Sequence, residues 1–232
     1  MNETALFIKN LISKEGPISL EKYTEICIQE YYSNNNTIGK EGDFITAPEI
    51  SQVFGELIGL WCLTSWEKLG KPKDFSLVEL GPGRGTLMSD ILRSVETISH
   101  DFIRYASIYL IETSSNLIEK QKTNLSKYNI KWLNNYTQLP QKPMIILGNE
   151  FLDALPIRQF IKVKDNWHER LVTYEDNNFL FTKSNFITDK YKDKFINAPD
   201  GSIFEISENM HTMIDSIAKL FLKNPGISLF ID

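Results

Sequence analysis

Apolar residues recur every three or four positions over residues 5–13 and again over residues 20–31. This spacing places the apolar side chains on one face of a helix and predicts two amphipathic helices. A third apolar run begins at residue 50 and predicts a longer helix that continues to about residue 69. Residues 1–70 are therefore expected to form a helical N-terminal part.

A helix-start signal precedes the third run. The sequence Thr46-Ala47-Pro48-Glu49 has the form of a capping box. In such a box the Thr46 hydroxyl accepts a hydrogen bond from the Glu49 amide, and the Glu49 carboxylate reaches back to the first residue. The local pattern thus explains Glu49 as a helix cap.

The pattern changes at Phe75 to short apolar runs that alternate with helical stretches. Strands are predicted at residues 76–80, 106–111, 130–133 and 144–147. Helices are predicted between them at residues 86–95 and 116–125. This alternation is typical of an α/β fold, in which helices cover both faces of a parallel sheet.

Residues 157–183 have a different pattern, with three strand-like runs separated by short clusters of Asp and Asn. Because these residues favour turns, the segment is expected to be an antiparallel meander inserted into a core of residues 71–232. A strand, a helix and a final strand at residues 227–231 follow. A doubly wound sheet normally closes with further strands, so the last strands of the sheet are expected to be absent.

Composition narrows the class of protein. The 232 residues are 42% hydrophobic and 24% charged, with a formal net charge of −5, which is ordinary for a globular chain. The acidic balance disfavours a nucleic-acid partner, because such proteins usually present a basic face. No apolar run is long enough to span a membrane, and the N-terminus does not resemble a signal or transit peptide, so a cytoplasmic location is expected.

Cysteine and histidine residues are few. Cys27 and Cys62 lie in apolar helical segments, and we interpret them as buried side chains in a reducing compartment. The histidines at positions 100, 168 and 211 are far apart in the sequence, so no metal site is expected.

The segment Glu79-Leu80-Gly81-Pro82-Gly83-Arg84-Gly85-Thr86 joins a predicted strand to a predicted helix. A glycine-rich turn in this place lets the backbone approach a nucleotide-like ligand and directs helix N-terminal amides at an anion. The dinucleotide fingerprint requires glycine at its sixth position, which here is Thr86. The spacing acid-x-Gly-x-Gly-x-Gly is instead similar to the cofactor loop of class I S-adenosylmethionine-dependent methyltransferases. A tight structural turn is the alternative.

Glu112 ends the second predicted strand, 31 positions after Gly81. A carboxylate at this place can accept hydrogen bonds from both hydroxyls of a ribose. The dinucleotide pattern expects the acid after a shorter gap, about 20 residues. The alternative interpretation of Glu112 is an exposed acid at a strand end.

Asn149, Glu150 and Asp153 follow the fourth predicted strand, at the sheet edge where open α/β sheets bind ligands. Methyl transfer from a sulfonium to a guanidinium needs the acceptor nitrogen in line with the methyl group. It also needs carboxylates that hold the guanidinium, and Glu150 and Asp153 can supply them. The alternative is a helix start, with Asn149 as its N-cap and the two acids in its first turn.

Three sequence blocks, taken together, resemble the MidA-like methyltransferases. In chain order they are Gly42–Glu56 (GDFITAPEISQVFGE), Glu79–Leu87 (ELGPGRGTL) and Asn149–Pro156 (NEFLDALP). The family includes the mitochondrial complex I assembly factor that dimethylates an arginine of a NADH dehydrogenase subunit. The resemblance covers nearly the whole chain, and members usually continue beyond Asp232, so this chain is expected to be short at its C-terminus.

The resemblance implies a Rossmann-like class I methyltransferase core that uses S-adenosyl-L-methionine. The implied cofactor-binding residues are Glu79, Gly81, Gly83, Arg84, Gly85 and Glu112. The implied catalytic residues are Asn149, Glu150 and Asp153. The N-terminal block would help to roof the cofactor and acceptor site.

Three functions stay open at this point. The first is an S-adenosylmethionine-dependent protein arginine N-methyltransferase that acts on a NADH dehydrogenase subunit and forms a homodimer. The second is a truncated, non-catalytic remnant or binding module of the same fold. The third is an NAD-dependent oxidoreductase, which Thr86 at the sixth position of the loop disfavours.

Overall fold

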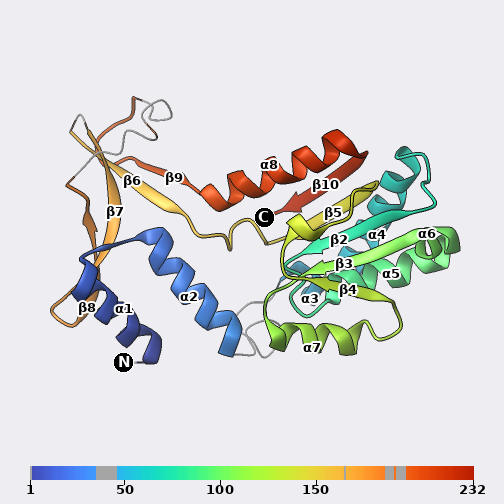
Figure 1. Ribbon diagram of the computed structural model, residues 1–232, viewed down its shortest axis with the longest axis horizontal. Coiled ribbons are helices and arrows are strands. Elements are labelled where there is room, and N and C mark those ends of the chain that lie inside the picture. Colours follow the sequence, from blue (N-terminus) through green and yellow to red (C-terminus); the bar gives the residue numbers. More distant parts are fainter. Residues whose placement is uncertain (1, 35–45, 165, 186–190, 192–196) are drawn as a thin grey trace. The chain divides into compact units, whose positions relative to one another are not determined.

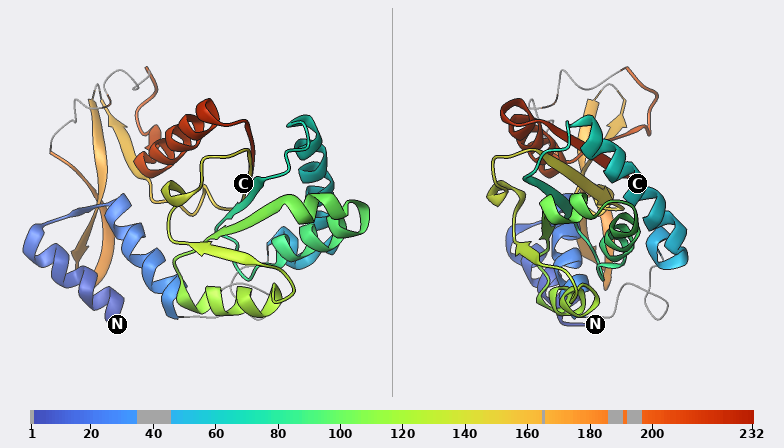
Figure 2. Two further views of the ribbon diagram at one scale, coloured as in Figure 1. Left: turned by 45° about the vertical axis from the view of Figure 1, so that its right-hand side comes forward. Right: turned by 90° about the vertical axis from the view of Figure 1, so that its right-hand side faces the viewer.

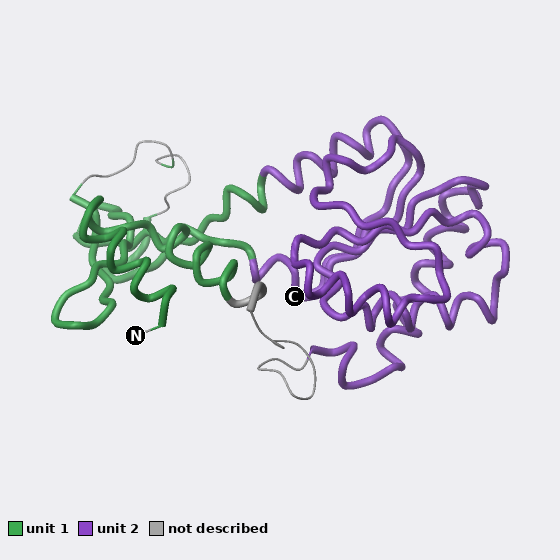
Figure 3. The backbone as a smooth tube through the Cα atoms, turned by 60° about the horizontal axis from the view of Figure 1, so that its bottom comes forward, with its two compact units in different colours: residues 1–31, 155–211 green, residues 32–154, 212–232 purple. Residues whose placement is uncertain are grey.

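The computed structural model describes residues 2–34, 46–164, 166–185, 191 and 197–232 (Figure 1). The chain divides into two compact units (Figure 3). Unit 1 combines residues 1–31 with residues 155–211, and unit 2 combines residues 32–154 with residues 212–232. This division differs from the boundary near residue 70 that the sequence predicts, because the first two helices pack with the inserted meander.

Unit 2 is built on a five-stranded parallel sheet with the strand order β10-β5-β2-β3-β4. Its strands are β2 (Phe75–Leu80), β3 (Ala106–Ile111), β4 (Ile130–Leu133), β5 (Met144–Asn149) and β10 (Gly226–Ile231). From β2 the chain builds outward through β3 and β4, and then returns to the other side of β2 with β5 and β10. Open α/β sheets bind ligands at the carboxyl ends of the strands where the winding reverses in this way.

Helices cover this sheet as the alternating pattern predicts. They are α3 (Ala47–Ile50), α4 (Gln52–Lys68), α5 (Thr86–Ile98), α6 (His100–Tyr105), α7 (Ser115–Asn124) and α8 (Glu208–Lys223), with a short 3-10 helix η1 (Tyr136–Gln138). α4 packs against α5, and α8 lies on the opposite side of the sheet (Figure 2). The predicted helix over residues 50–69 is present as α4, and the extended backbone at Ser51 (φ −144°, ψ 118°) separates it from the short helix α3.

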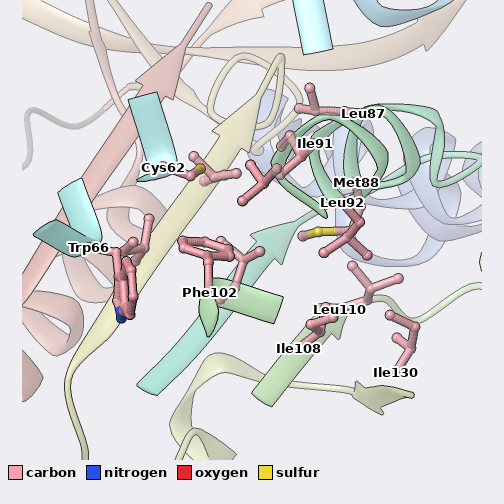
Figure 4. Close-up of a cluster of buried hydrophobic side chains, with 14 of the residues drawn as sticks. Cys62, Trp66, Leu87, Met88, Ile91, Leu92, Phe102, Ile108, Leu110 and Ile130 are labelled. Atoms are coloured by element: carbon pink, nitrogen blue, oxygen red, sulfur yellow. The ribbon is translucent and has the colours of Figure 1, made fainter. Parts of the chain in front are cut away.

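The main core of unit 2 lies between the sheet and the helices α4, α5 and α6 (Figure 4). Phe75 and Leu77 of β2 and Phe102 of α6 are completely buried in it. The rings of Phe75 and Phe102 meet edge to face with their centroids 5.0 Å apart. Because burial of one such side chain stabilises a fold by about 1.5–3 kcal/mol, this cluster fixes the strand whose end carries the glycine loop.

Unit 1 contains a five-stranded antiparallel sheet. Its strands are β1 (Ile18–Ser19), β6 (Arg158–Val163), β7 (Asn166–Glu175), β8 (Asn178–Lys183) and β9 (Ile203–Ile206). The expected meander is present as β6, β7 and β8, and the sheet is extended by β1 next to β7 and by β9 next to β6. The helices α1 (Glu3–Glu15) and α2 (Leu20–Asn34) pack on this sheet through a core that includes Ile8, Ile12 and Val172.

Candidate functional site

The candidate site residues start from neighbouring strand ends at one edge of the parallel sheet. Leu80, the last residue of β2, is paired with Ile111 of β3 on one side and with Gly148 of β5 on the other. The glycine loop, Glu112 and the segment from Asn149 therefore leave the sheet at adjacent positions. This is the edge at which such a sheet binds its ligand.

The glycine loop has a backbone that favours glycine. Gly81, Gly83 and Gly85 have φ angles of 60°, 54° and 81°, in the left-handed region where a Cβ atom is strained. A Cβ on Gly81 would lie only 2.6 Å from Cδ2 of Phe151. The Gly81 N–H donates to the Ile111 carbonyl at 3.1 Å, which ties the loop to the end of β3.

The third glycine of the loop is explained by where α5 begins. Gly85 is the N-cap residue of α5, with a left-handed backbone, and Thr86 is the first residue of the helix. A Cβ on Gly85 would lie 3.2 Å from Cδ1 of Leu125. The helix therefore needs glycine at the fifth position of the motif rather than at the sixth, which accounts for the departure from the dinucleotide fingerprint.

Glu79 lies inside β2, directly below the loop, and is 2% exposed. Its Oε2 has no hydrogen-bond partner within the described part of the chain, and burial raises the pKa of its carboxyl to about 8. Burial, and in addition the charge of Glu79, raises the pKa of the buried Cys62 thiol of α4. Such a carboxyl can ionise when a cationic group binds nearby.

Glu112 is 9% exposed, so the alternative interpretation as an exposed strand-end acid is wrong. Its Oε1 accepts hydrogen bonds from the backbone N–H groups of Thr113 (2.7 Å) and Ser114 (2.8 Å). Its Oε2 accepts from Nε2 of Gln121 at 3.3 Å. Burial raises the pKa of the Glu112 carboxyl, and these three hydrogen bonds oppose that rise.

Glu49 does not form the predicted capping box. Thr46 is the N-cap residue of α3, but its hydroxyl makes no capping hydrogen bond. Instead, Oγ1 of Thr86 donates to Oε1 of Glu49 at 2.5 Å, and Nη1 of Arg84 lies 3.5 Å from Oε2 of Glu49. The prediction is wrong because the Glu49 carboxylate contacts Thr86 and Arg84, which are distant in sequence, instead of the start of its own helix. Residues 42–45 of the same family block lie outside the described residues.

Replacing Glu49 by alanine should lower the free energy of unfolding by about 1 kcal/mol, because the Thr86 hydroxyl loses its acceptor. Replacing Thr46 by alanine should cost less than about 0.5 kcal/mol, because no side-chain cap is lost. Urea denaturation of Glu49→Ala and Thr46→Ala measures both differences. A larger loss for Thr46→Ala than for Glu49→Ala would contradict the structure and support the capping box.

The segment after β5 is an irregular turn. Glu150 has a left-handed backbone with φ 49°, and residues 150–155 contain no helical residue. The alternative interpretation, a helix capped by Asn149, is therefore wrong, and Asn149 is instead the last residue of β5.

The end of β10 holds this segment in place. The Glu150 N–H donates to the Ile231 carbonyl at 2.7 Å. The N–H groups of Leu152 and Asp153 donate to Oδ1 of Asp232 at 3.2 and 3.4 Å. Glu150 and Asp153 are both exposed at this edge. The role of Asp232 was not predicted, since nothing in its local sequence marks it.

The structure joins the two predicted cofactor elements through a residue that the sequence analysis missed. Gln121 of α7 is completely buried, and its Nε2 donates to the Gly83 carbonyl at 2.7 Å as well as to Glu112. Phe151 in turn places the acid segment against Gly81. No signal in the local sequence marks Gln121, because its burial and its bonds to Gly83 and Glu112 arise only when α7 packs in the fold.

The comparison with protein families decides the class. A model described as "Putative S-adenosyl-L-methionine-dependent methyltransferase" matches residues 57–232, which include the glycine loop, Glu112 and the acid segment. The chain belongs to this family. The resemblance to MidA-like methyltransferases is confirmed, and so is the α/β methyltransferase fold.

The curated relatives of this family member are named as protein arginine methyltransferases. "Protein arginine methyltransferase NDUFAF7, mitochondrial" of Xenopus laevis is 36% identical over 192 residues, which cover 69% of this chain and 43% of that protein. The corresponding homolog of Caenorhabditis elegans is 31% identical over 264 aligned residues, covering 100% of this chain and 61% of that protein. The chain thus spans about half the length of the curated relatives it matches.

A solved structure confirms the fold of this family member. A crystal structure of a protein from Burkholderia thailandensis bound to S-adenosyl-homocysteine matches with a TM-score of 0.83. The two chains are 22% identical, and the match covers 98% of this chain and 61% of the other. The α/β fold with its parallel sheet is therefore that of a known protein.

The residues of this site fit S-adenosylmethionine, the cofactor of the family. The loop glycines leave a cradle that a Cβ atom would fill or strain. Glu112 is a fixed carboxylate suited to ribose hydroxyls, and Glu79 has a buried oxygen without a partner in the described structure. S-adenosylmethionine carries a ribose and two cationic groups, so each of these features has a counterpart in it.

Proposed function

We propose that this chain is an S-adenosylmethionine-dependent protein arginine N-methyltransferase, with a NADH dehydrogenase subunit as its acceptor. One observation carries the proposal. The glycine loop and Glu112 leave the sheet next to two exposed acids, Glu150 and Asp153, on the adjacent strand end. The names of the curated relatives support arginine as the acceptor residue.

The cofactor supplies a methyl group on a sulfonium. The backbone of Gly81, Gly83 and Gly85 and the side chain of Arg84 bind the cofactor, and Glu112 orients its ribose. Glu150 and Asp153, with Asn149 beside them, hold the planar guanidinium of the acceptor, because carboxylates match its fork of N–H donors. This arrangement would align the acceptor nitrogen with the methyl group and stabilise the positive charge there. As the N–C bond forms, the C–S bond would break and leave a neutral thioether, and the nitrogen would release one proton to solvent at this exposed edge.

Calorimetric titration of the purified chain with S-adenosyl-homocysteine tests the proposal, with NADH as the control ligand. We expect a Kd below roughly 100 μM, which corresponds to about −5.5 kcal/mol, and no binding of NADH. Binding of NADH alone would instead support an oxidoreductase. A folded chain that binds neither ligand would support the non-catalytic remnant.

Two finer features are proposals as well. A homodimer is supported by three exposed apolar side chains at helical spacing on α4, Val53, Leu57 and Leu60, and by the exposed Ile50 of the preceding α3. Measurement of the mass in solution tests it.

No helix in the described ranges is long and apolar enough to cross a membrane. The cytoplasmic location stays a prediction, and the curated relatives are named as mitochondrial.

A further inference from the structure

One buried amide, that of Gln121 in α7, connects three parts of unit 2. Nε2 donates to the Gly83 carbonyl at 2.7 Å and to Oε2 of Glu112 at 3.3 Å. Oε1 accepts from Nε1 of Trp132 in β4 at 2.8 Å. Gln121 is 0% exposed, so solvent cannot replace any of these three partners.

The chemistry of these partners fixes the orientation of the amide. An indole N–H can only donate, so Trp132 requires the carbonyl oxygen of Gln121. The Gly83 carbonyl and the Glu112 carboxylate can only accept, so both require the NH₂ group. In a flipped amide, the NH₂ group would face the Trp132 N–H, and the carbonyl oxygen would face both the Gly83 carbonyl and the Glu112 carboxylate. None of these buried polar groups would then have a hydrogen-bond partner. Trp132 therefore determines which atom of Gln121 faces the glycine loop.

A second amide of α7 extends this contact along the loop. Nδ2 of Asn124, three residues after Gln121, donates to the Arg84 carbonyl at 2.9 Å. Two consecutive carbonyls of the loop are thus bound by one face of one helix. Since a trans peptide is planar, fixing the Gly83 carbonyl also directs the Arg84 N–H away from α7.

Glu112 is held from the same direction. Its other oxygen is fixed by the N–H groups of Thr113 and Ser114, and Ser114 is the N-cap residue of α7. The Glu112 carboxylate is therefore bound at the start of α7 and again at Gln121. The glycine loop is bound to the same helix at Gln121.

We propose that Gln121 is a positioning residue that sets the ribose-binding carboxylate of Glu112 against the glycine loop, with Trp132 fixing its orientation. The inference rests on the proposed function, because it assumes that the loop and Glu112 bind one cofactor. It adds that cofactor affinity depends on a side chain that does not itself touch the cofactor.

The test compares Gln121→Glu with wild type by calorimetric titration with S-adenosyl-homocysteine at pH 8 and pH 6. At pH 8 the new carboxylate repels Glu112 and cannot donate, so we expect binding weaker by about tenfold or more, the equivalent of one pKa unit. At pH 6 the buried new carboxyl is protonated, donates one hydrogen bond, and recovers most of the affinity. Gln121→Leu cannot donate at either pH and stays weak at both.

Other groups titrate near this site, so the affinity of each variant is divided by that of wild type at the same pH. They are the carboxyls of Glu79 and Glu112. The ammonium of Lys122 is a neighbouring charge, 6.0 Å from the Trp132 ring centroid. Gln141→Glu is the matched control, because Gln141 is exposed in a turn. It should bind like wild type at both pH values.

The outcomes separate the inference from the function on which it rests. Failure of wild type to bind S-adenosyl-homocysteine would contradict the proposed function. If wild type binds S-adenosyl-homocysteine and both Gln121→Glu and Gln121→Leu bind it with the same affinity as wild type, the positioning role alone is overturned. Trp132→Phe decides the matter if both Gln121 variants fail to fold: it keeps an aromatic ring in β4 but has no N–H to donate to Oε1 of Gln121, and we expect a loss of a few fold at both pH values. Unchanged affinity in that variant would also overturn the inference.

Discussion

Replacing Glu150 by glutamine should lower the rate of methyl transfer by about 10²–10³-fold, the usual effect of removing one electrostatic contact to a reacting group. The affinity for S-adenosyl-homocysteine should change little, because Glu150 lies on the segment after β5 and not on the glycine loop. Transfer of labelled methyl groups to an arginine-containing acceptor measures the rate, and calorimetry measures the affinity. Equal loss of both would mark Glu150 as structural.

The backbone of Glu150 permits a sharper form of this test. A side chain at φ 49° costs about 1–2 kcal/mol relative to glycine, so Glu150→Gly should be more stable than wild type and still inactive. Lys164→Gly is the matched control: Lys164 is exposed, has φ 56° and lies in the turn between β6 and β7. It should gain comparable stability and keep full activity. An active Glu150→Gly variant would contradict the proposed role of the carboxylate.

Glu79→Gln should change how stability depends on pH. The ordinary pKa of a glutamate is 4.5, and burial raises that of Glu79 to about 8. Between these values the folded chain binds the proton and the unfolded chain does not, so the free energy of unfolding falls as pH rises. Each pKa unit is worth about 1.4 kcal/mol, so the penalty from this one group reaches at most about 4 kcal/mol near pH 8. Glutamine removes it.

Urea denaturation at pH 5, 6.5 and 8 measures this effect. Glu79→Gln should be more stable than wild type at pH 8, and the difference should shrink towards pH 5. Glu67→Gln is the control, because Glu67 is a surface residue paired with Lys71, and it should keep the wild-type trend. A difference between Glu79→Gln and wild type that stays constant across this range would show that Glu79 ionises normally.

The elements of unit 2 could be predicted because their signals are local. Strand β2 has four apolar residues among its six, and α5 starts directly after the glycine that its left-handed N-cap needs. The positions of Gly81, Glu112 and Glu150 followed from the rule that strand ends share one edge. The helix α6 and the short strand β1 were not predicted, because six residues and two residues are too few to show a period.

The contacts that organise the site could not be predicted, because they join residues far apart in the sequence. Glu49 has a good local partner in Thr46, yet it accepts its hydrogen bond from Thr86. Gln121 resembles any polar residue of an exposed helix until α7 is placed against the loop and β4. Local spacing sets which conformations are available, and packing then selects the partner with the better geometry.

The pairing of β5 with β10 has a consequence for folding kinetics. The two strands are in register along their whole length, although residues 150–225 separate them. Closing so long a loop costs chain entropy before any contact repays it, which slows folding. Residues 155–211 fold within unit 1, so prior folding of that unit shortens the flexible length that must close. Since Ile231 and Asp232 hold the segment with Glu150, this acidic segment is expected to be the last part of the site to form during refolding.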